Sequence, residues 1–253
     1  MSNPTPKEET TKLKRKLSKK RLVVISLIAI FVLTVGTGFG LAVSIISKTP
    51  PFDPKRLVQA DQTSFIYDKD GNQIGMLHSK ENREIAESKD IPDIVKKSFV
   101  AVEDIRFYDH YGVDPQGIIR ALYKNLNGGK LEGASTITIQ LARNAFLSPE
   151  QNLTRKLQEA ALAVKLERLY TKDEILTFYL NRIFFGESAY GIKAAAKTYF
   201  GKELKDLNIA EVALLTGLPQ APSKYDPYLD PEKAKYRRTV VLQVLRDNKV
   251  ISQ

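Results

Sequence analysis

The longest apolar run of the chain lies near its N-terminus. Residues 22–47 are 26 residues without a charged side chain, more than the roughly 20 that a helix needs to cross a bilayer. A cleaved signal peptide has a shorter apolar region, ~7–15 residues, that ends in a small-residue cleavage site. Here the run is longer and ends at Ser47 without such a site. We therefore predict a transmembrane helix over residues 22–47.

The segments on either side of this run differ in charge. Residues 1–21 contain eight Lys or Arg and two Glu, and such clusters favour the cytoplasmic side of a membrane. We predict a cytoplasmic basic tail over residues 1–21 and a single-pass protein of the plasma membrane. Residues 48–62 include Thr49-Pro50-Pro51-Phe52-Asp53-Pro54, which predicts a stiff linker. Residues 63–253 would then form an extracytoplasmic domain.

The domain begins with a strand-like pattern and continues with helical spacing. Thr63–Tyr67 and Gln73–Leu77 flank a turn that contains Gly71, which is the pattern of a β-hairpin. Apolar residues between Ile94 and Val102 recur at helical spacing and lead into Glu103. The sequence therefore predicts a hairpin followed by a helix that ends near Glu103.

Helix-start signals recur along the rest of the domain. Ser148–Gln151 offers an N-cap residue followed by proline. Thr171–Glu174 has the spacing of a capping box. Two further buried helices are predicted at Ala194–Phe200 and Ile209–Leu218. The expected fold class is mainly α, with a small β-hairpin element and one preceding transmembrane helix.

Composition and charge exclude several function classes. The net charge is +10, but residues 1–21 supply +6 of it, so the rest of the chain is only mildly basic. That balance does not predict a nucleic-acid partner. The chain has no cysteine and two histidines, which excludes disulfides and thiolate metal sites and argues against zinc.

Glu103 is a candidate general base. A carboxylate near the C-terminus of an apolar helix meets the negative end of the helix dipole, and apolar neighbours such as Phe99 and Val100 add desolvation. Both effects raise the pKa of a glutamate, as a base working near neutral pH requires. The pattern alone also allows Glu103 and Asp104 to be ordinary polar residues at a helix end.

Arg155, Lys156 and Glu159 have a spacing that places them on one side of a helix. The same side carries apolar residues one turn later, so we predict a helix that is buried on all sides in its second half. Its charges would be confined to one end, where a site would use them. The alternative is a solvated face with exposed ion pairs.

The stretch Gly133–Asn144 is rich in hydroxyl and amide groups. It lacks the Gly-Lys-Ser/Thr of a Walker phosphate loop. Ser135 has no adjacent base, so we reject covalent catalysis. Polar side chains that bind sugar hydroxyls or pyrophosphate oxygens fit the stretch better.

Four polar clusters occur in a fixed order: Glu103–Gly112, Gly133–Asn144, Arg155–Glu159 and Tyr179–Gly186. Together they resemble the peptidoglycan glycosyltransferase domain, glycosyltransferase family 51, of class A penicillin-binding proteins and their monofunctional relatives. The resemblance covers about residues 60–250. It implies a lysozyme-like, mainly α fold with a cleft between two lobes.

The resemblance also implies a reaction. Lipid II would be polymerised into glycan strands by inverting glycosyl transfer from a lipid-pyrophosphate donor. Glu103 would deprotonate the acceptor hydroxyl, and Arg143, Arg155 and Lys156 would stabilise the departing pyrophosphate. A divalent cation, Mg or Mn, is possible near Glu159, while no cofactor is required. The implied partners are lipid II, the growing strand, membrane lipids and other cell-wall synthesis proteins.

Site residues follow from the matching motif positions. The implied catalytic residues are Glu103 and Glu159. The implied substrate-binding residues are Asp104, Phe107, His110, Ser135, Thr136, Gln140, Arg143, Arg155, Lys156 and Asn181. His110 also has a structural interpretation, fixing the turn before Gly112.

The chain departs from the family pattern at two positions. Ile139 stands where the family usually has a second glutamine, and Gln151 stands where many relatives have a basic residue. Each departure removes one expected contact with the donor. Two alternative functions stay open: a lysozyme-like glycoside hydrolase, and an inactive membrane-tethered scaffold. The transpeptidase signature Ser-x-x-Lys is absent from residues 1–253, and we expect the natural protein to continue into such a domain.

The stretch between Gly117 and Leu147 is a candidate for membrane contact. It mixes basic residues with the apolar residues Ile118, Ile119, Leu122, Tyr123 and Leu126, a composition suited to anionic headgroups. The alternative is an amphipathic helix that faces the core.

Overall fold

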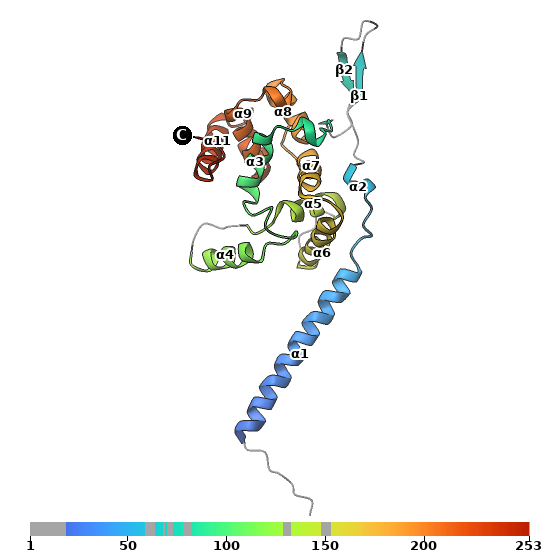
Figure 1. Cartoon of the computed structure of the whole chain (residues 1–253), viewed down its shortest axis with the longest axis vertical. Coiled ribbons are helices and arrows are strands. Elements are labelled where there is room, and N and C mark those ends of the chain that lie inside the picture. The colour runs from blue at the N-terminus through green and yellow to red at the C-terminus, as the bar shows by residue number, and fades with distance from the viewer. Residues whose placement is uncertain are drawn as a thin grey trace, which may run out of the picture. The chain divides into compact units, whose positions relative to one another are not determined.

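The computed structural model describes residues 19–58, 64–67, 69, 73–77, 82–128, 133–147 and 153–252 (Figure 1). The chain divides into two units, residues 1–48 and 49–253. The predicted N-cap at Ser148–Gln151 lies outside the described residues.

The first unit contains helix α1, Lys19–Ser47. Within it, Val23–Ser47 has a mean hydropathy of 2.3 and none of it is buried. By length and composition this helix can cross a membrane, which agrees with the predicted transmembrane segment. A signal sequence passes the same test, so the helix by itself does not assign an orientation.

The second unit begins with small β elements. Strands β1, Ser64–Tyr67, and β2, Gln73–Leu77, pair antiparallel, with Phe65 opposite Met76. The predicted hairpin is confirmed. Strand β3, Asn82–Arg83, pairs in parallel with β4, Ala189–Tyr190.

The rest of the unit is helical, and the predicted fold class is confirmed. Its α-helices are α2 Lys55–Val58, α3 Asp93–Glu103, α4 Pro115–Leu126, α5 Ile137–Phe146, α6 Leu153–Leu169, α7 Lys172–Arg182, α8 Ile192–Phe200, α9 Ile209–Gly217, α10 Pro222–Tyr225 and α11 Pro231–Asp247. Short 3-10 helices are η1 Ser88–Asp90, η2 Leu204–Asp206 and η3 Leu218–Gln220. The capping box at the start of α7 is present, with Thr171 and Glu174 each accepting the other's backbone N–H.

Buried side chains form a main cluster and a smaller one. The main cluster packs α5 against α6 and α7, and Phe99 of α3 meets Tyr179 and Phe185 edge-on there. The smaller cluster joins α3, α9 and α11 through Ala101, Ala213 and Val241. Helix α3 therefore belongs to both, and its last residue is Glu103. Figure 1 shows α5, α6 and α7 side by side, with α3, α9 and α11 grouped beside them.

Part of the predicted linker packs on the domain. The Phe52 ring lies 5.0 Å from that of Phe146, and Leu57 is buried in the main cluster. Arg182 of α7 donates to the carbonyl oxygen of Arg56 at 2.7 Å. Residues 52–58 are thus fixed to the face made by α5 and α7, because their apolar side chains find a core there.

The prediction that α6 is buried on all sides in its second half was wrong. Leu162, Ala163 and Leu166 are buried there, but Lys165 and Arg168 are exposed, and Leu169 at the end of the helix is 55% exposed. The buried face is the one that also carries Glu159. Apolar residues all round a helix gave no indication of which face the core would cover.

Candidate active site

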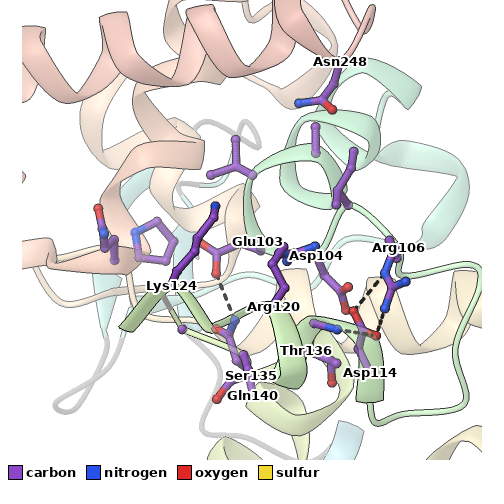
Figure 2. A pocket seen from close by; sticks show the side chains of 18 of the residues that line it. Glu103, Asp104, Arg106, Asp114, Arg120, Lys124, Ser135, Thr136, Gln140 and Asn248 are labelled. Carbon is purple, nitrogen blue, oxygen red and sulfur yellow. Dashed lines mark hydrogen bonds and ion pairs between the residues drawn. The ribbon is translucent and has the colours of Figure 1, made fainter. Parts of the chain in front are cut away.

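Glu103 stands on the wall of a cavity of about 790 Å³. It is the last residue of α3, and the chain leaves the helix at Asp104. The other walls come from α4, α5, the residues just before α5, η3 and α11. A cavity of this size can hold a ligand with a volume of several hundred cubic ångströms. Figure 2 shows the side chains that face it.

The carboxylate of Glu103 has one hydrogen-bond partner in α5. Gln140 Nε2 donates to Glu103 Oε2 at 2.9 Å, and Tyr179 Oη of α7 donates to Gln140 Oε1 at 3.3 Å. Figure 2 shows the first of these bonds. The resemblance placed Gln140 on the substrate. Here one of its amide hydrogens is directed at Glu103, while Gln140 also lines the cavity, so its contact with substrate stays a prediction.

The surroundings of Glu103 raise its pKa above the usual 4.5. Burial is the largest cause, opposed by the Gln140 hydrogen bond and by the charges of Arg237 and Arg143. Asp104 adds a smaller raising effect. The predicted direction and its desolvation cause are confirmed.

Arg237 of α11 was missed as a site residue by sequence reasoning. It lines the cavity, its Nε donates to the Gly217 carbonyl at 3.2 Å, and burial lowers its pKa. Several other charged residues surround Arg237 in the sequence of α11, so composition alone gave no reason to choose this arginine over its neighbours.

The loop after Glu103 is tied to the start of α5. The Asp104 carboxylate accepts from His110 Nε2 at 2.9 Å and from the Ile137 backbone N–H at 3.0 Å. Gly112 donates its N–H to His110 Nδ1, and Thr136 donates its hydroxyl to the Gly112 carbonyl at 2.6 Å. The structural interpretation of His110 is therefore confirmed. These bonds hold the loop that follows Glu103 against the start of α5, the helix that carries Gln140.

Five residues implied to bind substrate lie outside the cavity lining: Arg155 and Lys156 at the start of α6, and the buried residues Phe107, His110 and Asn181. Phe107 is fully buried, with the Lys172 ammonium 4.5 Å from its ring centre. His110 is buried against Asp104. Asn181 bonds both the N–H and the carbonyl of Ala86 at 2.9 Å. In this structure each of the three buried side chains holds protein segments together, and substrate contact by them stays a prediction.

Arg155, Lys156 and Glu159 come together at the start of α6. Glu159 is fully buried, with Arg155 Nε 3.0 Å from one carboxylate oxygen and Lys156 Nζ 2.8 Å from the other. Lys156 Nζ also lies 3.4 Å from Ser135 Oγ, which lines the cavity. The alternative of a solvated ion-pair face is excluded by the burial of Glu159. The charges adjoin the cavity through Ser135.

The residues around Glu159 do not fit a divalent cation. Both carboxylate oxygens already face a positive side chain, and a metal ion there would be repelled by both. Within the described ranges, no group of three or more His, Cys, Asp or Glu is placed to hold a metal.

The cavity lining carries more positive than negative side chains. Its acidic members are Glu103, Asp104 and Asp114, and its basic members are Arg106, Arg120, Lys124, Arg143 and Arg237. Asp114 is neutralised by an ion pair with Arg106 (Figure 2). The excess of arginine and lysine suits an anionic ligand such as pyrophosphate.

Sequence reasoning also missed Arg120 and Lys124 as residues of the cavity. Both lie in the stretch that was predicted to contact the membrane, yet both line the cavity from α4. Their spacing of four residues places them on one face of the helix, and that spacing could have separated them from the apolar face.

Comparison with known proteins assigns the family. A family model described as transglycosylase matches residues 70–246. The chain belongs to the transglycosylase family. The resemblance found in the sequence is thereby confirmed, and the matched range includes every residue that lines the cavity except Asn248.

The transglycosylase chain is similar to several penicillin-binding proteins. It is 44% identical to penicillin-binding protein 1F of Bacillus subtilis (strain 168), over 94% of this chain and 33% of that protein. It is 42% identical to penicillin-binding protein 1A/1B of the same organism, over 99% of this chain and 27% of that one. The chain therefore spans a third or less of the length of these relatives.

A crystal structure of penicillin-binding protein 1A from Haemophilus influenzae is also similar. It is 28% identical, with a TM-score of 0.44, and the match covers 77% of this chain and 19% of that one.

Proposed function

We propose that this domain polymerises lipid II into peptidoglycan glycan strands by inverting glycosyl transfer. The observation that carries the proposal is the placement of Glu103. It is a carboxylate of raised pKa on the wall of a cavity whose lining is rich in arginine and lysine. Membership of the transglycosylase family supports a glycosyl-transfer reaction, and the donor that we propose for it is a lipid-linked sugar pyrophosphate.

Glu103 serves as the general base in this proposal. Its carboxylate takes the proton of the acceptor sugar 4-hydroxyl as that oxygen attacks the anomeric carbon of the donor. The bond from the anomeric carbon to the pyrophosphate oxygen breaks, and the lipid pyrophosphate leaves with the electron pair. A base near its operating pH contributes about 10²–10⁴-fold.

Positive side chains stabilise the leaving pyrophosphate. Arg143 lines the cavity on α5, the helix that also supplies Gln140. Lys156 reaches the lining at Ser135 and is held by Glu159. Fixed positive groups that face a developing negative charge lower the barrier without reorganisation. Glu159 thus acts through the two cations that it positions.

The cavity gives less support to a glycoside hydrolase. A glycoside hydrolase needs a second carboxyl group beside the bond that it cleaves. Of the lining carboxylates other than Glu103, Asp104 is bound to His110 and Ile137, and Asp114 is paired with Arg106. In the described lining neither is left to act as nucleophile or base.

The scaffold alternative rested on Ile139. Its side chain is 8% exposed and belongs to the main apolar cluster, outside the cavity lining. The departure at this position therefore leaves the pair Glu103 and Gln140 intact.

The proposal includes a location. Helix α1 would span the plasma membrane, with the basic residues 1–21 in the cytoplasm and the domain outside. Lipid II, the growing strand and membrane lipids would be its partners, together with other proteins of cell-wall synthesis.

Labelled lipid II separates the three functions. The full chain in detergent should lengthen lipid II into strands, and Glu103→Gln should not. Release of short fragments from preformed strands would instead identify a hydrolase. Absence of both activities in a folded wild-type protein would leave the scaffold.

A further inference from the structure

A chain of hydrogen bonds joins three helices behind Glu103. Tyr179 of α7 donates to Gln140 Oε1 on α5, and Gln140 Nε2 donates to Glu103 at the end of α3. Tyr179 is fully buried and lies outside the cavity lining. It therefore touches no space that a substrate could occupy.

The side-chain amide of Gln140 has two orientations, and they suit different charge states of Glu103. An ionised carboxylate only accepts hydrogen bonds, so it requires the NH2 group of the amide. A protonated carboxyl could instead donate to the amide oxygen, with the amide turned over. Turning it over would place the amide NH2 opposite the Tyr179 hydroxyl, whose oxygen could accept from it but whose own hydrogen would lose the acceptor that Gln140 Oε1 now provides. A buried hydroxyl that loses its acceptor is unfavourable.

We propose that Tyr179 is a positioning residue for the general base: its hydroxyl fixes the Gln140 amide in the orientation that donates to ionised Glu103. This inference rests on the proposed function of Glu103. It adds a residue from outside the cavity that favours the reactive, ionised form of the base.

The other charged groups that act on Glu103 are Arg237 of α11, Arg143 of α5 and Asp104. Neither arginine nor Asp104 is bonded to the Tyr179 hydroxyl. Tyr179→Phe keeps the ring, whose centre lies 6.4 Å from that of Phe99. The substitution therefore removes the hydroxyl and leaves the charges and the aromatic packing in place.

The test is the pH profile of kcat/KM for lipid II polymerisation by the full chain. A general base must be ionised, so activity falls as pH drops through its pKa. Tyr179→Phe should move this acid limb to higher pH by about 0.5–1 unit, a roughly three- to tenfold loss on the acid side. Tyr199→Phe is the matched control, because it also removes a tyrosine hydroxyl that donates to a protein oxygen, in this case from α8 to the Phe185 carbonyl. Its acid limb should stay in place.

A double-mutant cycle links the effect to Gln140. Gln140→Met should shift the acid limb as well, and Tyr179→Phe should add nothing further in that background. An unmoved limb in Tyr179→Phe, or a further shift in the double variant, overturns the proposal. If Tyr179→Phe fails to fold, 3-fluorotyrosine at this position provides a stronger donor and should move the limb to lower pH.

An activity-independent measurement keeps this inference separate from the proposed function. Infrared titration of the full chain reports the protonated carboxyl of Glu103, assigned by difference from Glu103→Gln. If the wild type makes no strands, the proposed function fails. In that case, a higher pKa of Glu103 in Tyr179→Phe than in wild type would still support the positioning role of Tyr179. An unchanged pKa of Glu103 would overturn it.

Discussion

The guanidinium of Arg237 acts on the carboxylate of Glu103, although the two residues lie on α11 and α3, far apart in the sequence. The positive charge of Arg237 lowers the pKa of Glu103. Burial has the opposite and larger effect, so the pKa of Glu103 is raised overall. In return, Glu103 favours the charged form of Arg237, which burial disfavours. Helix α11 thus supplies part of the electrostatic setting of the proposed base.

Arg237→Met should therefore raise the pKa of Glu103. Methionine fills much of the same space beside Gly217, but it removes the charge. We expect the acid limb of polymerisation to move to higher pH, and Arg237→Lys to restore part of the difference. The measurement is the pH profile of kcat/KM. Arg238→Met is the matched control, because Arg238 does not line the cavity, and an equal shift in that variant would contradict the assignment.

Glu103→Gln should abolish polymerisation and leave the fold intact. A general base is worth about 10²–10⁴-fold, so strand formation from lipid II should fall by at least that factor. Turnover within a few-fold of wild type would remove Glu103 from this role.

The same substitution should stabilise the domain at neutral pH. The folded-state pKa of Glu103 is raised above its usual 4.5, so ionisation costs stability as pH rises from that value through the folded-state pKa. Glutamine does not ionise, and the difference in melting temperature should grow across this window and then level off. Each kcal/mol corresponds to about 2–4 °C for a domain of this size. A variant that melts lower than wild type at neutral pH would contradict the stated cause.

Glu159→Gln should reduce activity less than Glu103→Gln does. Glutamine keeps an oxygen for Arg155 or Lys156 to contact, whereas Glu159→Ala removes the buried carboxylate that both cations face. Removing the buried member of an ion pair is unfavourable, so the alanine variant should also melt at lower temperature. Strand synthesis and thermal unfolding are the two measurements. Full activity with an unchanged melting temperature in Glu159→Ala would refute the prediction.

Helix α4 should bind anionic membranes. Ile119, Leu122, Tyr123 and Leu126 are 58–77% exposed, so the alternative of an apolar face turned to the core is wrong. Residues 49–253 should bind anionic liposomes at low salt, and Leu122→Glu with Leu126→Glu should weaken that binding.

The matched control for this experiment is Leu169→Glu with Leu229→Glu, two leucines exposed elsewhere at 55% and 70%. This pair should leave liposome binding nearly unchanged. If residues 49–253 show no affinity for the liposomes, the surface is not a membrane contact and α1 alone provides the tether.

Leu57→Ala should destabilise the domain by about 2–4 kcal/mol, as expected for a buried leucine. Leu57 is 4% exposed and belongs to the main cluster, although the sequence placed it in a linker. Leu169→Ala, at an exposed position, should change stability by less than about 0.5 kcal/mol. Urea unfolding of residues 49–253 measures both. Equal stabilities for the two variants would mean that residues 52–58 do not pack as described.

Local signals in the sequence predicted the elements that local physics controls. The hairpin at residues 64–77, the helix that ends at Glu103, and the capping box at Thr171 were all predicted and are present. In each case the deciding interaction joins residues close in the chain. The direction of the Glu103 pKa shift was predicted from apolar neighbours on its own helix, whereas the burial that causes the shift is completed by the packing of the domain around α3.

Tertiary structure decided the partners of those residues. The packing of α3, α5, α7 and α11 brings Gln140 and Arg237 to the Glu103 carboxylate. The same packing places the Tyr179 hydroxyl within hydrogen-bond distance of Gln140. The buried face of α6 and the docking of Phe52 have the same origin. Apolar periodicity tells which residues prefer burial, but the neighbour that covers each face is chosen by shape and charge across the whole domain.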